Sequence, residues 1–190
     1  IGLFNGDWDE AGYRTQRFVE QALAKPMPES DKFPYLMFDS WGYGEDINEE
    51  KLFKAAKIAA ELGAEVFTVD LGWAERIGDW FPDRKKFPRG LKPLSDYVHS
   101  LGMKFGLHWP LVQAHIESPM LKRNPDWTSS VDHGYFGATS LCLGHQPVKQ
   151  YLINEGIRII REYGVDWILQ DGENMVKVCE KTDHTHHPRG

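Results

Sequence analysis

The sequence predicts an α/β fold of the (βα) TIM-barrel type, with about four strand–helix units. Short, continuously apolar stretches alternate with longer segments of helical periodicity, which is typical of a parallel sheet covered by helices. Each apolar stretch also runs into acidic or aromatic residues at its carboxyl end. Because a complete barrel takes eight strands and roughly 250 residues, this chain of 190 residues corresponds to half a barrel.

The predicted elements follow one another from residue 34 onward. We assign residues 1–33 to an N-terminal helix, centred on "YRTQRFVEQALA", and a linker, and residues 34–190 to the half-barrel. Four apolar stretches are the predicted strands, and three amphipathic stretches are the helices between them. The strands span 34–42, 65–73, 104–112 and 165–171, and the helices span 46–63, 91–102 and 146–164.

Capping residues mark the ends of two predicted helices. Asp46 and Glu49 have the spacing of a capping box at the start of the first helix, and Gly63 ends it. Pro147 lies in the first turn of the third helix, and Gly164 follows its last turn. The first and third helices have an apolar face predicted to pack on the sheet: Leu52, Phe53, Ala56, Ala59 and Ala60 in the first, and Val148, Tyr151, Leu152, Ile159, Ile160 and Tyr163 in the third.

Composition argues against several classes of partner. The net charge is −6 and the basic residues are scattered, which disfavours nucleic acid and anionic membranes. No stretch reaches the length of a membrane span and no signal peptide is visible, so we expect a cytoplasmic, bacterial protein. Neither a metal nor a cofactor is expected, since we interpret Cys142 and Cys179 as small buried apolar residues and His184, His186 and His187 as a solvated tail.

Polar and aromatic side chains gather at the carboxyl ends of the predicted strands, where barrel enzymes place their active sites. A single aspartate at a strand end is usually a helix cap or turn former, whereas three of them with tryptophans nearby favour a binding site. Indole rings stack on the apolar faces of sugars, and carboxylates accept hydrogen bonds from sugar hydroxyls. The sequence therefore predicts carbohydrate binding by Asp39 and Trp41, Asp70 and Trp73, His108 and Trp109, and Asp171 with Glu173 and Asn174.

Five motifs occur in one order along the chain: "DLGW", "GDWFPDRKKFPRGL", "LGMKFGLHWP", "SPMLKRNPDW", and an aspartate that closes a strand after "YGVDWI". Together they resemble the catalytic barrel of glycoside hydrolase family 36, the α-galactosidases and their relatives. The resemblance runs over about residues 10–175. Within it, "YRTQRFVEQAL" is similar to the segment that joins the N-terminal β-sandwich of that family to its barrel.

The resemblance implies a retaining α-glycosidase that acts on α-galactosides or related α-glycosides. It implies that Asp171 is the catalytic nucleophile, that Asp70 holds substrate hydroxyls, and that Asp79 and Trp80 wall the sugar pocket.

Three positions depart from the family pattern. The second strand usually ends in two acids, and here the second is Leu71. The third-strand motif usually carries an acid after Trp-Pro, and "HWPLVQ" has none. The fourth strand usually reads Lys-Trp-Asp, and here Leu169 and Gln170 precede Asp171.

In this family the general acid/base lies at the end of the sixth barrel strand. The four strands predicted here do not reach that position. A four-stranded parallel sheet would also leave two open edges and a bare inner face. We therefore expect a homodimer or larger assembly that closes the barrel, in which the partner's Asp70 takes the sixth position and faces Asp171. The alternative is a non-catalytic sugar-binding or scaffold half-barrel. A barrel aldolase or isomerase is disfavoured, because no lysine ends a strand and no phosphate-binding glycine loop is evident.

Overall fold

The structure, a computed structural model, describes residues 6–23, 36–131, 136–171 and 178–186. The chain forms two compact units, Ile1–Pro34 and Tyr35–Gly190. Among the helices within the described ranges, none is both long and apolar enough to cross a membrane.

The first unit contains one helix and its extension. Helix α1 (Trp8–Phe18) begins at Asp7, whose Oδ1 accepts a hydrogen bond from the backbone N–H of Glu10 at 3.0 Å. The chain continues into a turn of π-helix, η1 (Val19–Leu23). No residue of α1 or η1 is buried, so the described part of this unit has no core of its own.

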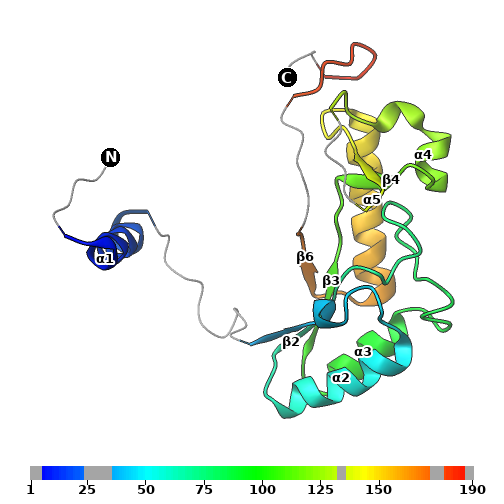
Figure 1. The fold of residues 1–190 in the computed structure, drawn as a ribbon. Helices are drawn as coiled ribbons and strands as arrows, with labels where there is room; N and C mark the ends of the chain where they lie inside the picture. Colours follow the sequence, from blue (N-terminus) through cyan, green and yellow to red (C-terminus); the bar gives the residue numbers. More distant parts are fainter. Residues whose placement is uncertain (1–5, 24–35, 132–135, 172–177, 187–190) are drawn as a thin grey trace. The chain divides into compact units, whose positions relative to one another are not determined.

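The second unit is built on a four-stranded parallel sheet (Figure 1). Neighbouring strands lie in the order β1-β2-β3-β6, which is also their order in the chain, as expected for consecutive (βα) units. The predicted parallel α/β sheet is therefore confirmed. The strands are β1 (Met37–Asp39), β2 (Val66–Val69), β3 (Lys104–His108) and β6 (Trp167–Leu169).

Helices α2 (Glu49–Glu61), α3 (Lys92–Ser100) and α5 (Gln146–Tyr163) connect these strands at the predicted places. Helix α3 lies between the other two and contacts both of them as well as β3. Helix α5 is capped at its end by Gly164, as predicted, and this glycine adopts a left-handed conformation (φ 69°). On α5, Ile160 was expected on the apolar face but is 48% exposed, because Ile159 takes the position toward the core.

The start of α2 differs from the prediction. The N-cap is Asn48, whose Oδ1 accepts a hydrogen bond from the backbone N–H of Lys51 at 2.9 Å. Asp46 lies before the helix, and its Oδ2 pairs with Lys51 Nζ at 2.6 Å. The predicted capping box of Asp46 and Glu49 is therefore wrong, since Asp46 forms an exposed ion pair instead.

The long connection between β3 and α5 contains structure that the sequence did not indicate. Strands β4 (Gln113–His115) and β5 (Ala138–Ser140) form an antiparallel pair. Between them, helix α4 (Pro119–Arg123) leads into the 3-10 turn η4 (Pro125–Trp127). These elements are short and largely polar, so no hydrophobic period marks them.

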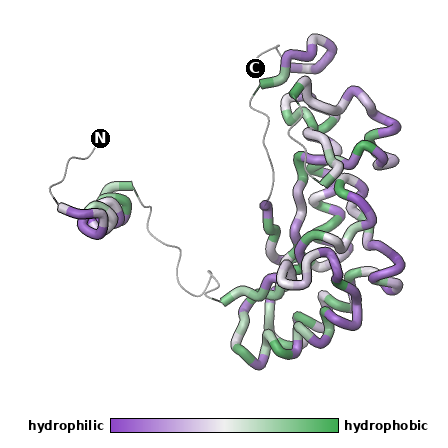
Figure 2. The backbone as a smooth tube through the Cα atoms, in the orientation of Figure 1, coloured by the Kyte–Doolittle hydropathy of each residue, from purple (hydrophilic) through white to green (hydrophobic). Residues whose placement is uncertain are grey.

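The hydrophobic core lies between the sheet and its helices, where the green segments of the tube meet (Figure 2). Alternate residues of the central strands, such as Phe67 and Leu107, are fully buried in it. On the opposite face of β2, Val66 and Thr68 are also buried, at 0% and 2% exposure. The predicted bare inner face is therefore absent at the centre of the sheet, and exposed apolar side chains occur at edge strand β1, where Met37 is 42% exposed.

Candidate active site

Four strand ends bring polar groups together at the carboxyl edge of the sheet. Asp39 ends β1, Asp70 follows β2, His108 ends β3 and Asp171 lies just beyond β6. His108 joins them: its Nδ1 is 3.4 Å from Asp70 Oδ1, and its Nε2 is 3.1 Å from the backbone oxygen of Asp171. His108 is only 2% exposed, and its ring contacts groups at the ends of both β2 and β6.

The two aspartates of the first and second strands are fixed by backbone groups. Asp39 Oδ1 accepts the N–H of Trp41 at 2.7 Å, and Asp70 Oδ1 accepts the N–H of Leu71 at 2.5 Å. The N–H of Asp70 in turn donates to Ser40 Oγ at 2.8 Å. Ser40 is fully buried, and sequence reasoning missed it because a serine after a strand-end aspartate usually signals only a turn.

The carboxyl of Asp39 does not have its ordinary acidity. Burial of the carboxyl by its neighbours, together with the adjacent Asp70, raises its pKa from 3.8 to about 6, against the opposing effect of the Trp41 amide. The residue as a whole remains exposed at the edge of the sheet, so solvent screens part of this effect. Functional sites often contain a carboxyl whose pKa is raised by burial and by a second carboxyl nearby.

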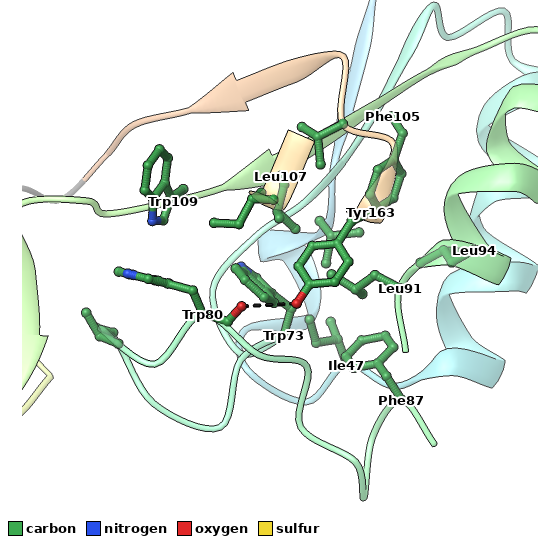
Figure 3. Close-up of a cluster of buried hydrophobic side chains, with 14 of the residues drawn as sticks. Ile47, Trp73, Trp80, Phe87, Leu91, Leu94, Phe105, Leu107, Trp109 and Tyr163 are labelled. Atoms are coloured by element: carbon green, nitrogen blue, oxygen red, sulfur yellow. Dashed lines mark hydrogen bonds between the residues drawn. The ribbon is translucent and has the colours of Figure 1, made fainter. Parts of the chain in front are cut away.

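Three of the predicted sugar-binding tryptophans form a buried aromatic cluster below this edge (Figure 3). The ring centroids of Trp73 and Trp80 are 6.2 Å apart in a stacked arrangement, and Trp109 meets Trp80 edge-on at 6.1 Å. Trp73 Nε1 donates to the His108 carbonyl at 2.8 Å, which ties the cluster to the strand ends. Trp73, Trp80 and Trp109 are 1%, 1% and 7% exposed, so contact between these rings and a sugar stays a prediction.

The loop that carries Trp80 is held from α5. Trp80 has a left-handed backbone conformation (φ 44°), and its carbonyl accepts a hydrogen bond from Arg158 Nη2 at 2.8 Å. The same carbonyl accepts the Tyr163 hydroxyl at 3.2 Å (Figure 3). Two residues earlier, the Gly78 carbonyl accepts the Tyr151 hydroxyl at 3.2 Å. Arg158 has no signal in the sequence, because an arginine on an amphipathic helix usually faces solvent.

Asp79 and Trp41 are the remaining predicted site residues within the described ranges. The carboxyl of Asp79 has a pKa raised by burial, although the amide of Met120 and the charge of Arg76 oppose the shift. Trp41 is 48% exposed and meets Phe136 edge-on, with ring centroids 6.5 Å apart. Phe136 is itself on the wall of an open cavity of about 290 Å³ beside the loop after β2. Glu173 and Asn174 lie outside the described residues.

A second group of reactive side chains was not predicted. Cys142, Cys179, His184 and His186 place one sulfur or nitrogen atom each within 4.8 Å of all the others. His184 is only 7% exposed, so its assignment to a solvated tail is wrong. The expectation that the cysteines are buried is met, at 3% and 4% exposure. The spacing in the sequence does not indicate this group, because Cys142 is far from the other three residues along the chain.

The fold and the strand-end groups define this unit as a parallel (βα) unit with polar side chains at the carboxyl edge of its sheet, where barrel proteins place their active sites. The family described as Melibiase matches residues 9–188, and the chain belongs to that family. The resemblance to glycoside hydrolase family 36 is thereby confirmed.

Relatives and solved structures agree with this assignment. The chain is 34% identical over 150 residues to the α-galactosidase Mel36A of Lactobacillus acidophilus, which covers 73% of this chain and 20% of that protein. The crystal structure of family 36 α-galactosidase AgaA from Geobacillus stearothermophilus matches with a TM-score of 0.65 and 29% identity, over 72% of this chain and 20% of that one. TtGalA, the Thermus thermophilus α-galactosidase solved with stachyose, matches with a TM-score of 0.67 and 27% identity, over 75% and 33%. The chain spans about a fifth of the length of the curated relatives it matches.

Proposed function

We propose that this chain is the nucleophile-bearing part of a retaining α-glycosidase that acts on α-galactosides or related α-glycosides. The observation that supports it most is the meeting of Asp39, Asp70, His108 and Asp171 at four adjacent strand ends, within a family whose matched relatives are named α-galactosidases. Those names also disfavour the alternative, a non-catalytic sugar-binding half-barrel.

In the proposed reaction Asp171 attacks the anomeric carbon of the substrate. The bond from that carbon to the leaving oxygen breaks as the bond to the Asp171 carboxylate forms, and a general acid delivers a proton to the leaving oxygen. The resulting carboxylate then takes a proton from water, which displaces Asp171 and gives the free sugar. In this proposal Asp70 and Asp39 accept hydrogen bonds from sugar hydroxyls, as carboxylates at adjacent strand ends.

By the resemblance to family 36, the general acid/base lies at the end of the sixth barrel strand, whereas the described residues form four parallel strands. We propose that a second copy of the chain supplies the remaining strands, in which the partner's Asp70 stands across the mouth from Asp171. The exposed apolar side chains at edge strand β1 support such an addition, because an open edge favours pairing with another strand. Retaining enzymes hold the two carboxyls about 5–5.5 Å apart, and this is the spacing that the closed barrel has to reach.

The nucleophile is tested by trapping the glycosyl intermediate. With an activated aryl α-galactoside, whose leaving group needs little acid help, the wild-type chain should form a covalent adduct of one hexose on the peptide that contains Asp171. The Asp171→Asn variant should form none. Asp96→Asn, which changes an exposed carboxylate on α3, should behave as wild type. If mass spectrometry still detects the adduct in Asp171→Asn chains, Asp171 is not the nucleophile.

The shared site is tested by mixing two inactive variants. Asp171→Asn and Asp70→Asn chains should each lack turnover, and their mixture should regain part of it, because some heterodimers then carry one site with both carboxylates. Light scattering should give a molar mass of at least twice 21.8 kDa. A mixture that stays inactive although heterodimers are shown to form would refute the shared site while leaving Asp171 as nucleophile. A stable monomer would refute completion of the barrel by a second copy.

A further inference from the structure

We propose that Cys142, Cys179, His184 and His186 form a structural binding site for one Zn²⁺ ion, separate from the strand-end site. Two thiols and two imidazoles are the donor set that zinc prefers in closed, four-coordinate sites. The four ligand atoms lie within 4.8 Å of one another, so a single ion between them can reach all four. None of these residues takes part in the proposed glycosidase reaction.

The spacing of the ligand atoms fits a tetrahedron of the right size. With metal distances of about 2.3 Å to sulfur and 2.0–2.1 Å to nitrogen, tetrahedral edges are roughly 3.6 Å between sulfur and nitrogen and 3.3 Å between two nitrogens. The observed distances are 3.3 Å between His184 Nδ1 and His186 Nε2, and 3.6 Å between Cys179 Sγ and His184 Nδ1. Cys142 Sγ lies 3.1 Å from His186 Nε2, so only a small opening of this edge is needed.

The orientation of His184 also indicates a cation. Its Nε2 lies 2.7 Å from the backbone oxygen of Asp126, which can only accept, so Nε2 carries the ring proton. In the neutral ring, Nδ1 then presents a lone pair toward Cys179 Sγ and His186 Nε2. A shared thiol or ring proton can join any one pair of these atoms, whereas a single cation between them can satisfy all four at once. A histidine ligand whose second nitrogen donates to a carbonyl is the usual outer-shell arrangement of a zinc site.

The surrounding fold holds the ligands in place before any metal binds. Cys142 lies just beyond β5, and the other three ligands lie on the segment 178–186. The ring of His184 stacks on that of His145 at 4.5 Å, and the N–H of Gln146 donates to Thr185 Oγ1 at 2.7 Å. The segment is thus attached to the start of α5. The segment 178–186 follows Asp171 closely in the sequence. A bound ion would therefore hold the chain in place shortly after the proposed nucleophile.

The test measures metal directly in the 190-residue chain, purified under reducing conditions. Elemental analysis should give about one zinc per chain. Replacement by Co²⁺ should produce the visible bands of a tetrahedral ion and a near-ultraviolet thiolate-to-cobalt band. Cys142→Ser and His186→Gln should each weaken Zn²⁺ binding by more than roughly 100-fold, since even the loss of an outer-shell partner costs 10–100-fold.

His115→Gln is the matched control, because His115 lies on β4 outside the group. It should bind Zn²⁺ as wild type does. Circular dichroism of each variant shows whether it is folded, and the cobalt spectrum of the wild-type chain does not depend on any variant folding. The proposal is overturned if the reduced wild-type chain gives no tetrahedral cobalt spectrum, or if Cys142→Ser and His186→Gln bind Zn²⁺ as tightly as wild type. Because no readout is glycosidase activity, failure here leaves the proposed function untouched.

Discussion

Gly106 is the position at which one added methyl group should disturb the sheet most directly. It lies at the middle of β3, opposite Thr68 of β2. A Cβ at this position would lie 2.5 Å from Thr68 Oγ1 and 3.2 Å from both Thr68 Cα and Cβ. Real Cβ contacts essentially never fall that short, and the β-branched Thr68 has little rotamer freedom with which to move away. In Gly106→Ala chains, β2 and β3 must therefore separate slightly or twist.

The expected loss of stability combines two opposing effects. Overpacking of a buried site costs about 1–3 kcal/mol. Replacing glycine by alanine restores roughly 0.4–1 kcal/mol, because the unfolded chain becomes less flexible. The net loss for Gly106→Ala should therefore be about 1–2 kcal/mol, which lowers the melting temperature by roughly 2–8 °C in a domain of this size. Thr68→Ala removes the clashing atoms, so the double variant should recover at least about 1 kcal/mol relative to additivity.

The assay is urea unfolding followed by tryptophan fluorescence, which reports on the cluster around Trp73 and Trp80. Gly42→Ala is the matched control, since an added Cβ there has no neighbour within 4 Å, and it should stay within about 0.5 kcal/mol of wild type. A Gly106→Ala variant as stable as Gly42→Ala would refute the reasoning. Strict additivity of Gly106→Ala and Thr68→Ala would show that the cost does not come from this contact.

Two further predictions concern charged groups. The raised pKa of Asp39, about 6 against 3.8 when unfolded, means that the folded chain holds this proton more tightly. The stabilisation is complete below pH 3.8 and is lost as the pH rises through about 6, so wild type should lose stability relative to Asp39→Asn over that window. Parallel pH profiles in thermal unfolding would contradict this. Arg158→Lys should cost about 1–3 kcal/mol in urea unfolding, because one ammonium cannot replace the guanidinium contacts to Trp80, Tyr163 and Glu155. The exposed Arg161→Lys change on the same helix should cost almost nothing, and equal losses for both would argue against the contacts.

The strand ends were predictable because their signal is local. An apolar stretch that runs into Asp39, Asp70 or Asp171 is visible in any short window, and parallel strands bring such ends to one edge. Helix caps are less certain, because Asp46 and Asn48 are both suitable caps and only the backbone conformation selects Asn48. The strand-end tryptophans show a further limit, since nothing in "DLGW" tells whether the indole faces the core or the mouth.

The cysteine and histidine group was beyond sequence reasoning for a different reason. Cys142 follows a strand of the β4–β5 pair, which has no hydrophobic period, and its partners come from the segment 178–186. Cys142 comes close to these residues only because the segment 178–186 packs against the start of α5. The loop contact of Arg158 is of the same kind, because it joins residues far apart in the chain.

The attachment of the Gly78–Trp80 loop to α5 has a consequence for how this protein can change. Tyr151 and Arg158 hold the loop by the carbonyls of Gly78 and Trp80, and every residue type has a carbonyl. The backbone conformation restricts Gly78, where a Cβ would lie 2.7 Å from that of Ala114. Asp79, between the two anchored carbonyls, has no positive φ, although its half-buried carboxyl accepts the amide of Met120. A library randomised at residue 79 alone would therefore change the side chain while the carbonyl contacts of Gly78 and Trp80 still hold the loop, and it would test whether this position contacts sugar as proposed.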